Sequence, residues 1–263
     1  MSGAMSEPAD DSRQQLPPAG GIDALTVRSF IHTLRSHLTA IKPAVEYMAG
    51  TDVEVSVREE MAAIICDAAD RIEHLASDLG ILAVPHRMRE NDQLGAVDLA
   101  DIVRRVVARL ATQAQTMGAW LALDLDRNCP PVQGYTRALA QVVENCLRLV
   151  LMMARCGDRV VIELRPVRTD EGLPSEVDMR IHVQSAGSMR SCEPVEFQGV
   201  PWDAARFIAQ EHGGMLRSLD DCVGLLVRLP ACPLTNRPAA MAVGAGGRSV
   251  GILAPRPTAQ SAH

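Results

Sequence analysis

The sequence predicts an α+β protein, in which an N-terminal antiparallel helical hairpin is followed by a sandwich of helices on one face of a mixed sheet. Two apolar runs near the N-terminus predict the hairpin, because positions repeated every three and four residues share one helix face. Farther along, helical patterns alternate with runs rich in Val, Ile and Leu, which favours a sheet covered by helices. Hydrophobic residues make up 47 % of the chain and aromatic residues only 3 %, so aliphatic side chains must fill the cores.

Residues 23–49 form the first predicted helix of the hairpin, and residues 55–82 form the second. Only a short segment joins them, so the two helices must run antiparallel. Asp23 stands where an N-cap carboxylate accepts backbone hydrogen bonds. The apolar seam comprises Val27, Ile31, Leu34, Leu38, Ile41, Val45 and Met48 in the first helix, and Val57, Met61, Ile64, Ala68, Ile72, Leu75, Leu79 and Leu82 in the second.

The apolar seam of this hairpin is larger than two helices can cover. A second copy packed against the first completes a four-helix bundle and removes the remaining seam from water. The sequence therefore predicts a homodimer formed through the hairpin, which we assign to residues 23–83.

A polar linker at residues 84–97 precedes the sandwich, which we assign to residues 98–232. Residues 1–22 and 233–263 are rich in Pro, Gly and small polar residues and are predicted to be disordered tails. Within the sandwich, the pattern predicts helices at 98–117, 136–154 and 201–212, and strands at 120–126, 159–167, 176–185, 215–219 and 223–230.

Composition and charge exclude several classes of partner. The formal net charge is −6 and no Lys/Arg block occurs, so we expect no nucleic-acid binding. No stretch approaches the roughly 18 apolar residues of a membrane helix, and the N-terminus lacks the apolar core of a signal peptide. The seven cysteines show no Cys-x-x-Cys spacing and the histidines no metal-ligand spacing. We therefore expect a cytoplasmic protein with reduced thiols and no metal site.

The first helix carries the most informative motif. Its segment HTLRSHLTAI, from His32 to Ile41, resembles the H-box of histidine kinases, with His32 at the phosphoacceptor position. Farther on, AVDLADIVRRVVARL resembles the start of the kinase ATP-binding domain, GYTRALAQVVENCL resembles its N-box helix, and EHGG at 211–214 matches a run after its G2 box. Order and spacing match over about residues 25–230. The chain thus resembles a histidine-kinase core, with a HisKA-type hairpin and a HATPase-like (GHKL) domain.

The residues that bind magnesium and adenine in that family are altered here. In the N-box, Asn145 is retained, but the family's magnesium-holding asparagine is replaced by Leu149. Leucine offers no oxygen to a cation that requires oxygen ligands. In the G1 box, Ser185 stands in place of the adenine-binding aspartate; Gly187 is retained, and Met189 replaces the second glycine.

The phosphate-binding G2 box is altered as well. Gly199 is retained, but Pro201 and Asp203 replace two small residues. Proline removes a backbone N–H, and the acid adds negative charge where phosphates would lie. Losing one hydrogen bond to a charged group costs roughly 1.5–3 kcal/mol, which is about a factor of ten or more in affinity. The resemblance therefore implies a degenerate ATP site with no bound cofactor.

The H-box itself is partly retained. His32 follows Ile31 of the seam and so faces solvent, as a phosphoacceptor must. The resemblance implies that its imidazole attacks an aspartyl phosphate on a receiver domain. Arg35 is placed to neutralise phosphoryl charge, and Ser36 falls where family members with phosphatase activity carry Thr or Asn; an ordinary helix-surface role stays open for both. Thr33 replaces the acid that acts as general base in kinases.

Three functions remain open from the sequence. The leading hypothesis is a dimeric histidine phosphotransferase, similar to bacterial phosphotransferases with a degenerate ATPase domain, that relays phosphate between response-regulator receiver domains through His32. The receiver would supply the magnesium. The second is a non-catalytic pseudo-histidine-kinase scaffold that binds a partner kinase or regulator, which Thr33 and His37 favour; His37 replaces the family's proline and is also a rival acceptor. The third is a divergent ATP-dependent histidine kinase.

Overall fold

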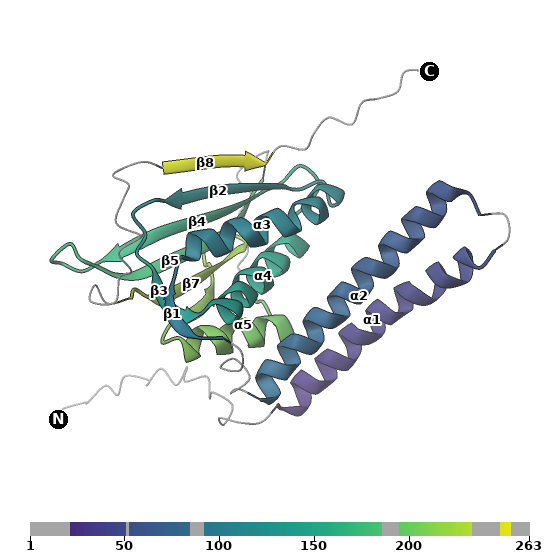
Figure 1. Cartoon of the computed structure of the whole chain (residues 1–263), viewed down its shortest axis with the longest axis horizontal. Coiled ribbons are helices and arrows are strands. Elements are labelled where there is room, and N and C mark those ends of the chain that lie inside the picture. The colour runs from purple at the N-terminus through teal and green to yellow at the C-terminus, as the bar shows by residue number, and fades with distance from the viewer. Residues whose placement is uncertain (1–21, 51–52, 85–91, 186–194, 233–247, 254–263) are drawn as a thin grey trace, which may run out of the picture.

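The computed structural model describes residues 22–50, 53–84, 92–185, 195–232 and 248–253, the last of these by its backbone alone. Within them a long helical hairpin lies beside a sandwich of helices and strands (Figure 1). This architecture confirms the α+β fold class that the sequence predicts.

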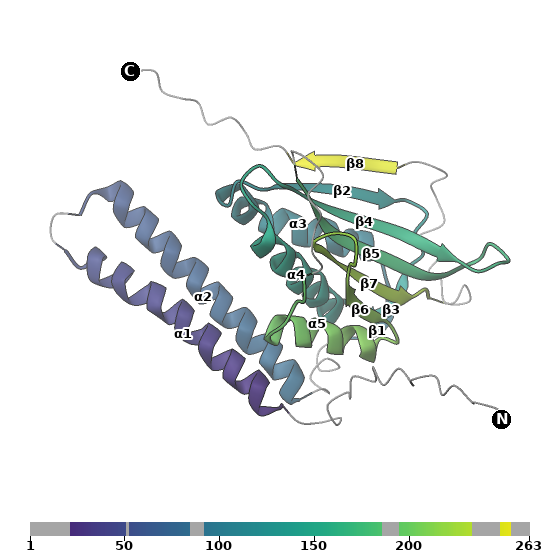
Figure 2. The ribbon, with the colours of Figure 1, turned by 180° about the vertical axis from the view of Figure 1, so that it is seen from behind.

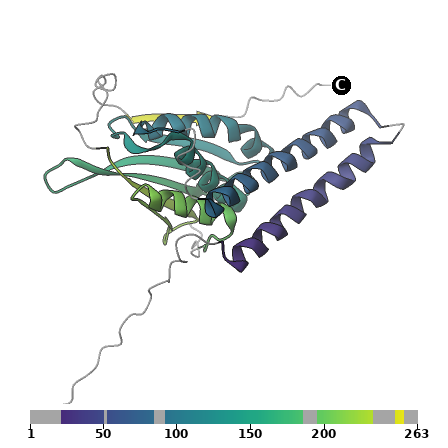
Figure 3. The ribbon, with the colours of Figure 1, turned by 60° about the horizontal axis from the view of Figure 1, so that its bottom comes forward.

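The hairpin consists of α1 (Ala24–Met48) and α2 (Val55–Ala83). The side chain of Asp23 caps α1, because its Oδ1 accepts a hydrogen bond of 2.6 Å from the amide of Thr26. In all three views α2 lies between α1 and the sandwich, and the far end of the hairpin projects away from the rest of the molecule (Figures 1, 2 and 3). None of the described helices, these two long ones included, combines the length and the apolar character needed to cross a membrane.

The sandwich domain has three helices on one face of a sheet (Figures 1 and 2). The strand order is β6-β7-β5-β4-β2-β8, in which β2 and β4 are parallel and the other neighbours antiparallel; β1 and β3 form a separate antiparallel pair. The elements are β1 (Leu94–Val97), α3 (Leu99–Thr116), β2 (Trp120–Asp126), β3 (Val132–Tyr135), α4 (Thr136–Met153), β4 (Arg159–Arg168), β5 (Pro174–Gln184), α5 (Val200–Glu211), β6 (Met215–Ser218), β7 (Gly224–Pro230) and β8 (Arg248–Leu253).

Aliphatic side chains fill the core between these helices and the sheet, as the composition predicts. Burying each of them contributes roughly 25 cal/mol per Å² of apolar surface removed from water. The largest fully buried side chains are Ile102, Leu125, Leu139, Leu147, Leu151, Ile162, Leu164, Met179, Ile181, Ile208, Leu225 and Leu229.

Three strands, β1, β3 and β8, lie where the sequence pattern predicts no strand. Strand β1 falls inside the segment assigned to the linker 84–97, and it pairs with the equally short β3 so that Gly95 lies opposite Gly134. Four-residue strands that contain glycine carry too weak a pattern to be recognised from sequence. Strand β8 falls inside the tail 233–263, where a short apolar run pairs with the edge of β2. The remaining residues of both predicted tails, 1–21 among them, lie outside the described residues.

The Glu-His-Gly-Gly run after α5 forms a structural corner. The amide of Tyr135 donates a hydrogen bond of 3.1 Å to Nε2 of His212, so Nδ1 carries the proton and donates it to the Ile208 carbonyl at 2.7 Å. A Cβ atom at Gly214 would lie 2.2 Å from the carbonyl oxygen of Arg228, so only glycine fits. His212 therefore ties α5 to β3 as a neutral imidazole.

Candidate functional site

His32 lies on α1 with its side chain exposed. Among the described residues, no hydrogen bond or ion pair involves its imidazole, so both ring nitrogens face water. The Ser36 hydroxyl donates a hydrogen bond of 3.1 Å to the His32 carbonyl one turn earlier. The Thr39 hydroxyl donates one of 2.8 Å to the backbone carbonyl of Arg35. The guanidinium of Arg35 is exposed, one turn from the imidazole.

An apolar stripe runs along α1 beside His32. Val27, Ile31, Leu38 and Val45 belong to the seam that the sequence predicts, and they are 41 %, 42 %, 49 % and 50 % exposed within one chain. Packing on α2 buries Ala44 to 3 %, but it leaves this stripe in water. The single chain therefore does not complete the apolar seam.

His37 and Thr33 lie on a different side of α1 from the apolar stripe. Both are half-buried and line a pocket between the hairpin and the sandwich domain. Burial lowers the pKa of His37, and the nearby guanidinium of Arg71 lowers it further. The two histidines of the H-box-like segment thus have different surroundings: His32 faces solvent and His37 faces the sandwich domain.

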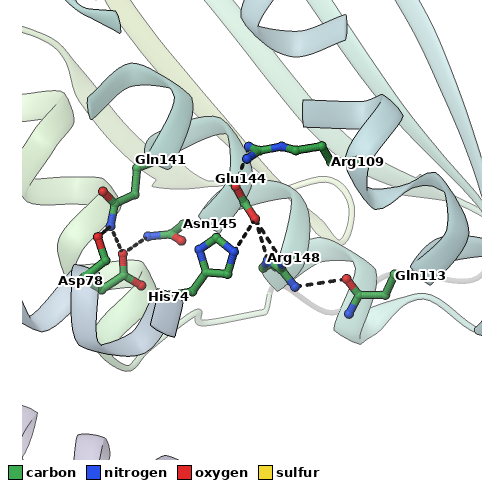
Figure 4. A network of polar contacts seen from close by, with 9 residues as sticks. His74, Asp78, Arg109, Gln113, Gln141, Glu144, Asn145 and Arg148 are labelled. Carbon is green, nitrogen blue, oxygen red and sulfur yellow. Dashed lines mark hydrogen bonds and ion pairs between the residues drawn. The ribbon is translucent and has the colours of Figure 1, made fainter. Parts of the chain in front are cut away.

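The retained asparagine of the N-box-like helix binds the hairpin. Asn145 on α4 donates from Nδ2 to Oδ1 of Asp78 on α2 at 2.7 Å, and to the Pro201 carbonyl on α5 at 3.2 Å. Gln141 donates from Nε2 to the same Asp78 oxygen at 2.5 Å (Figure 4). Asp78 is 1 % exposed. The amide of Asn145 is therefore engaged by protein groups from two neighbouring helices.

Burial dominates the titration of Asp78. It raises the pKa of this carboxyl to about 6, because the charged form loses its hydration. The hydrogen bonds from Asn145 and Gln141 and the charge of His74 favour the ionised form but do not outweigh burial, and Glu144 adds to the rise.

A second carboxylate, Glu144, lies in the same interface with cationic neighbours. Its Oε2 accepts from Arg109 Nη2 at 2.6 Å, and its Oε1 accepts from Arg148 Nη2 at 2.9 Å and lies 3.0 Å from Nε2 of His74 (Figure 4). Burial raises the pKa of Glu144, but the hydrogen bonds and charges of His74 and Arg148 outweigh it and lower the pKa to about 2. Glu144 is therefore ionised at every physiological pH.

The other residues of the altered nucleotide motifs do not form one site. Leu149 lines the pocket beside Asn145; the pocket holds about 170 Å³, less than the roughly 300–1,000 Å³ of typical ligand sites. Ser185 is exposed at the end of β5, and Gly187 lies outside the described residues. Gly199 precedes α5 with φ of +98°, a conformation that favours glycine.

The described parts of the chain contain no metal-binding cluster. No group of three or more His, Cys, Asp or Glu side chains lies close enough there to hold a metal ion. The carboxylates of the interface are instead engaged by amide, guanidinium and imidazole nitrogens.

One pattern in the sequence indicates a contact between the hairpin and a polar partner. Asp78 lies three residues after Leu75 and three before Ile81, both of which are buried, so an acid stands on a buried helix face. A charged residue in such a position requires a polar partner. Its partner Asn145, however, is 67 residues away and could not be identified without the fold.

Comparison with known proteins identifies the architecture. No family model and no curated protein matches the sequence. Among solved structures, the Acinetobacter baumannii histidine kinase AdeS superposes with a TM-score of 0.50 at 15 % identity, over 78 % of this chain and 95 % of that one. Histidine kinase ThkA, in its complex with response regulator protein TrrA, superposes with a TM-score of 0.54 at 14 % identity, over 80 % of this chain and 62 % of that one. The chain therefore has a histidine-kinase-like core fold, with a helical hairpin and a HATPase-like domain.

Proposed function

We propose that this protein is a histidine phosphotransferase of two-component signalling, in which His32 accepts a phosphoryl group from one receiver domain and donates it to another. The observation that supports the proposal most directly is the contrast between two site residues. The His32 imidazole is open to solvent, whereas the Asn145 amide is hydrogen-bonded to Asp78 and Pro201. A carrier histidine needs access for a partner, and a kinase needs a free nucleotide site.

The chemistry requires only one nucleophile from this chain. The unprotonated ring nitrogen of His32 attacks the phosphorus of an aspartyl phosphate, so that a P–N bond forms while the P–O bond to the carboxylate breaks. The carboxylate leaves with the electron pair, and the imidazole gives its extra proton to solvent. Arg35, one turn away and exposed, is placed to offset phosphoryl charge. The receiver domain supplies the magnesium, since phosphoryl transfer depends mainly on positioning and charge neutralisation.

The partners in this proposal are a second copy of the chain and a receiver domain. The exposed stripe of Val27, Ile31, Leu38 and Val45 supports a homodimer, because a second hairpin would cover it as a four-helix bundle. The kinase ThkA, similar in fold, was solved with a response regulator bound. A receiver domain that approaches the hairpin from solvent would meet the exposed side chain of His32, which no described residue engages in a hydrogen bond or ion pair.

The altered nucleotide motifs support transfer without ATP. Leu149 offers no oxygen to magnesium, Ser185 lacks the carboxylate for adenine, and Asn145 is engaged by the hairpin. The sandwich domain then acts as a folded scaffold and needs no cofactor of its own.

Phosphate transfer from prepared receivers tests the proposal. Receiver domains from the same genome are phosphorylated, freed of phosphodonor, and mixed with wild type, His32→Gln or His37→Gln. We expect the wild type and His37→Gln to take up phosphate, and His32→Gln to lose at least about 100-fold in rate, because its amide cannot replace the nucleophile. Unchanged circular dichroism would show that the variants are folded. Uptake by His32→Gln would refute the assignment.

A non-catalytic scaffold is the second candidate. It is favoured by Thr33, which lines the interdomain pocket and provides no acid, and by Ser36, whose hydroxyl already bonds to the His32 carbonyl. The scaffold function would be supported if the wild type accepted phosphate from none of the receivers in its genome but still bound a partner kinase or regulator.

A further inference from the structure

We propose that Asp78 on α2, with Gln141 and Asn145 on α4, forms a proton-sensitive contact that holds the hairpin against the sandwich domain. We call this contact the latch; it is closed when the hydrogen bonds to Asp78 are formed and open when they are broken. The latch is independent of whether His32 carries a phosphoryl group, because its hydrogen bonds join α2, α4 and α5, whereas His32 lies on α1.

The geometry of the Asp78 contact ties three helices together. Oδ1 of Asp78 accepts both amide donors, from Gln141 at 2.5 Å and from Asn145 at 2.7 Å, and Asn145 also donates to the Pro201 carbonyl at 3.2 Å. One side chain of α2 therefore fixes α4, and through Asn145 also α5. Separation of the two domains would break both hydrogen bonds to Asp78 together and return its carboxyl group to water.

A second contact lies one turn earlier on the same face of α2. His74 and Asp78 are four residues apart, so they project side by side toward α4 (Figure 4). His74 lies 3.0 Å from Glu144, which is 5 % exposed and also paired with Arg148. Two points of contact fix the orientation of α2 on α4, whereas one would leave it free to pivot.

The arrangement around Asp78 makes the latch sensitive to protons. Both amide donors use Oδ1, so Oδ2 can hold a proton while both hydrogen bonds remain. Among the described residues no cation forms an ion pair with Asp78, and a buried carboxylate without one is costly. The titratable and charged groups around the contact are Arg71 and His74 on α2 itself, Glu144 and Arg148 on α4, and His37 on α1; α5 contributes the Pro201 carbonyl.

The closed latch therefore binds a proton at Asp78 more tightly than the open one. The pKa of Asp78 rises from 3.8 to about 6 on burial, so its contribution is complete below pH 3.8 and is lost as the pH rises through about 6. Asparagine at this position would keep the acceptor oxygen without the charge, and should hold the latch closed at every pH.

Carboxyl footprinting tests the geometry. A carbodiimide and an amine label accessible carboxylates, and mass spectrometry compares Asp78 with exposed Asp70 two turns earlier on α2. We expect Asp78 to be protected in the wild type, and Gln141→Ala and Asn145→Ala each to raise its labelling at least about fivefold. Gln115→Ala, on an exposed position of α3, should leave it unchanged. Equal labelling of Asp78 in the wild type and in both variants would overturn the latch.

The pH dependence of thermal stability tests whether the latch responds to protonation of Asp78. Asp78→Asn should unfold at a higher temperature than the wild type at pH 7.5 and by a smaller margin at pH 5, because the penalty on the wild type grows between pH 3.8 and about 6. Asp78→Ala should unfold at a lower temperature at both pH values, because the acceptor is lost. Asp70→Asn controls for a general charge effect and should show no trend with pH. A constant difference between Asp78→Asn and the wild type at both pH values would overturn the proton-sensitive part of the proposal.

Discussion

Helices α1 and α4 carry the two motifs that define the kinase-like core, and they are built in opposite ways. Of the 25 described residues of α1, Ala44 alone is buried, and a stripe of aliphatic side chains faces water. Of the 18 residues of α4, ten are buried, among them the polar Glu144 and Asn145. The motif on α1 remains accessible to a partner, whereas the motif on α4 is part of the protein interior.

This difference suggests which motif retains a chemical role. An exposed helix with an incomplete apolar seam is stabilised by what binds to it, such as a second hairpin or a receiver domain. A buried helix whose buried polar side chains, Glu144 and Asn145, are paired contributes to stability and to the orientation of the hairpin. The exposure of His32 agrees with the proposed phosphotransfer, and the paired amide of Asn145 agrees with a structural role for the motif on α4.

A leucine-to-alanine substitution should lower the free energy of unfolding more in α4 than in α1. Leu147→Ala leaves a cavity beneath the sheet and should lower the free energy of unfolding by about 2–5 kcal/mol, because Leu147 is completely buried. Leu38→Ala should cost less than about 1 kcal/mol at concentrations where the chain is monomeric, because Leu38 is 49 % exposed. Urea unfolding at low protein concentration measures both values. Equal losses would contradict the contrast between the helices.

A charge in the exposed stripe should act on assembly rather than on folding. We expect the wild type to sediment with twice the 28.3 kDa mass of one chain. Leu38→Asp should weaken dimerisation by roughly 100-fold or more, because each copy places a carboxylate in the apolar interface. Thr39→Asp, at the neighbouring exposed position, is the matched control and should stay dimeric. A monomeric wild type at micromolar concentration would exclude the four-helix bundle.

Removing the charge of Glu144 should weaken the interface of α4 with its neighbours. Glu144→Gln should cost about 1–3 kcal/mol of stability at pH 7, because Arg148 and His74 lose their common partner. The lowered pKa of Glu144 means that its contribution is present above pH 4.5 and is lost as the pH falls through about 2. Glu73→Gln, on the exposed side of α2, is the control and should change stability by less than about 0.5 kcal/mol.

Restoring one magnesium ligand should change ATP binding least of all, because the other altered motifs remain. Leu149→Asn returns an oxygen to the N-box position, but Ser185 and Pro201 still depart from the adenine and phosphate motifs. We therefore expect neither the wild type nor this variant to bind ATP–magnesium at micromolar concentration in calorimetry, or to label itself from γ-labelled ATP. Self-labelling of the wild type would instead favour the divergent kinase.

Long periodic segments of the sequence predicted most of the fold. The helix 136–154 agrees with α4 to within one residue, and the strand 120–126 coincides with β2, because their apolar patterns extend over many residues. The strands β1, β3 and β8 were not predicted, since each is stabilised by a partner strand that the local sequence does not reveal.

The sequence predicted those features of the candidate site that depend on one helix alone, and not the contacts between distant helices. The exposure of His32 followed from its place beside Ile31 on one helix. The engagement of Asn145 did not, because Asp78 and Pro201 come to it from helices distant in sequence. Departures at Leu149 and Ser185 indicated a weakened nucleotide site, but only the fold revealed what the retained asparagine binds.

The most direct test of the account is to identify the residue that carries phosphate. Wild-type protein is incubated with a phosphorylated receiver domain and no ATP, digested at alkaline pH to preserve phosphohistidine, and sequenced by tandem mass spectrometry. The account predicts one phosphorylated histidine, His32, in the peptide from α1, and its loss when unphosphorylated receiver is added in excess. Phosphate on His37 or another residue, or label that appears only when ATP is supplied, would contradict it.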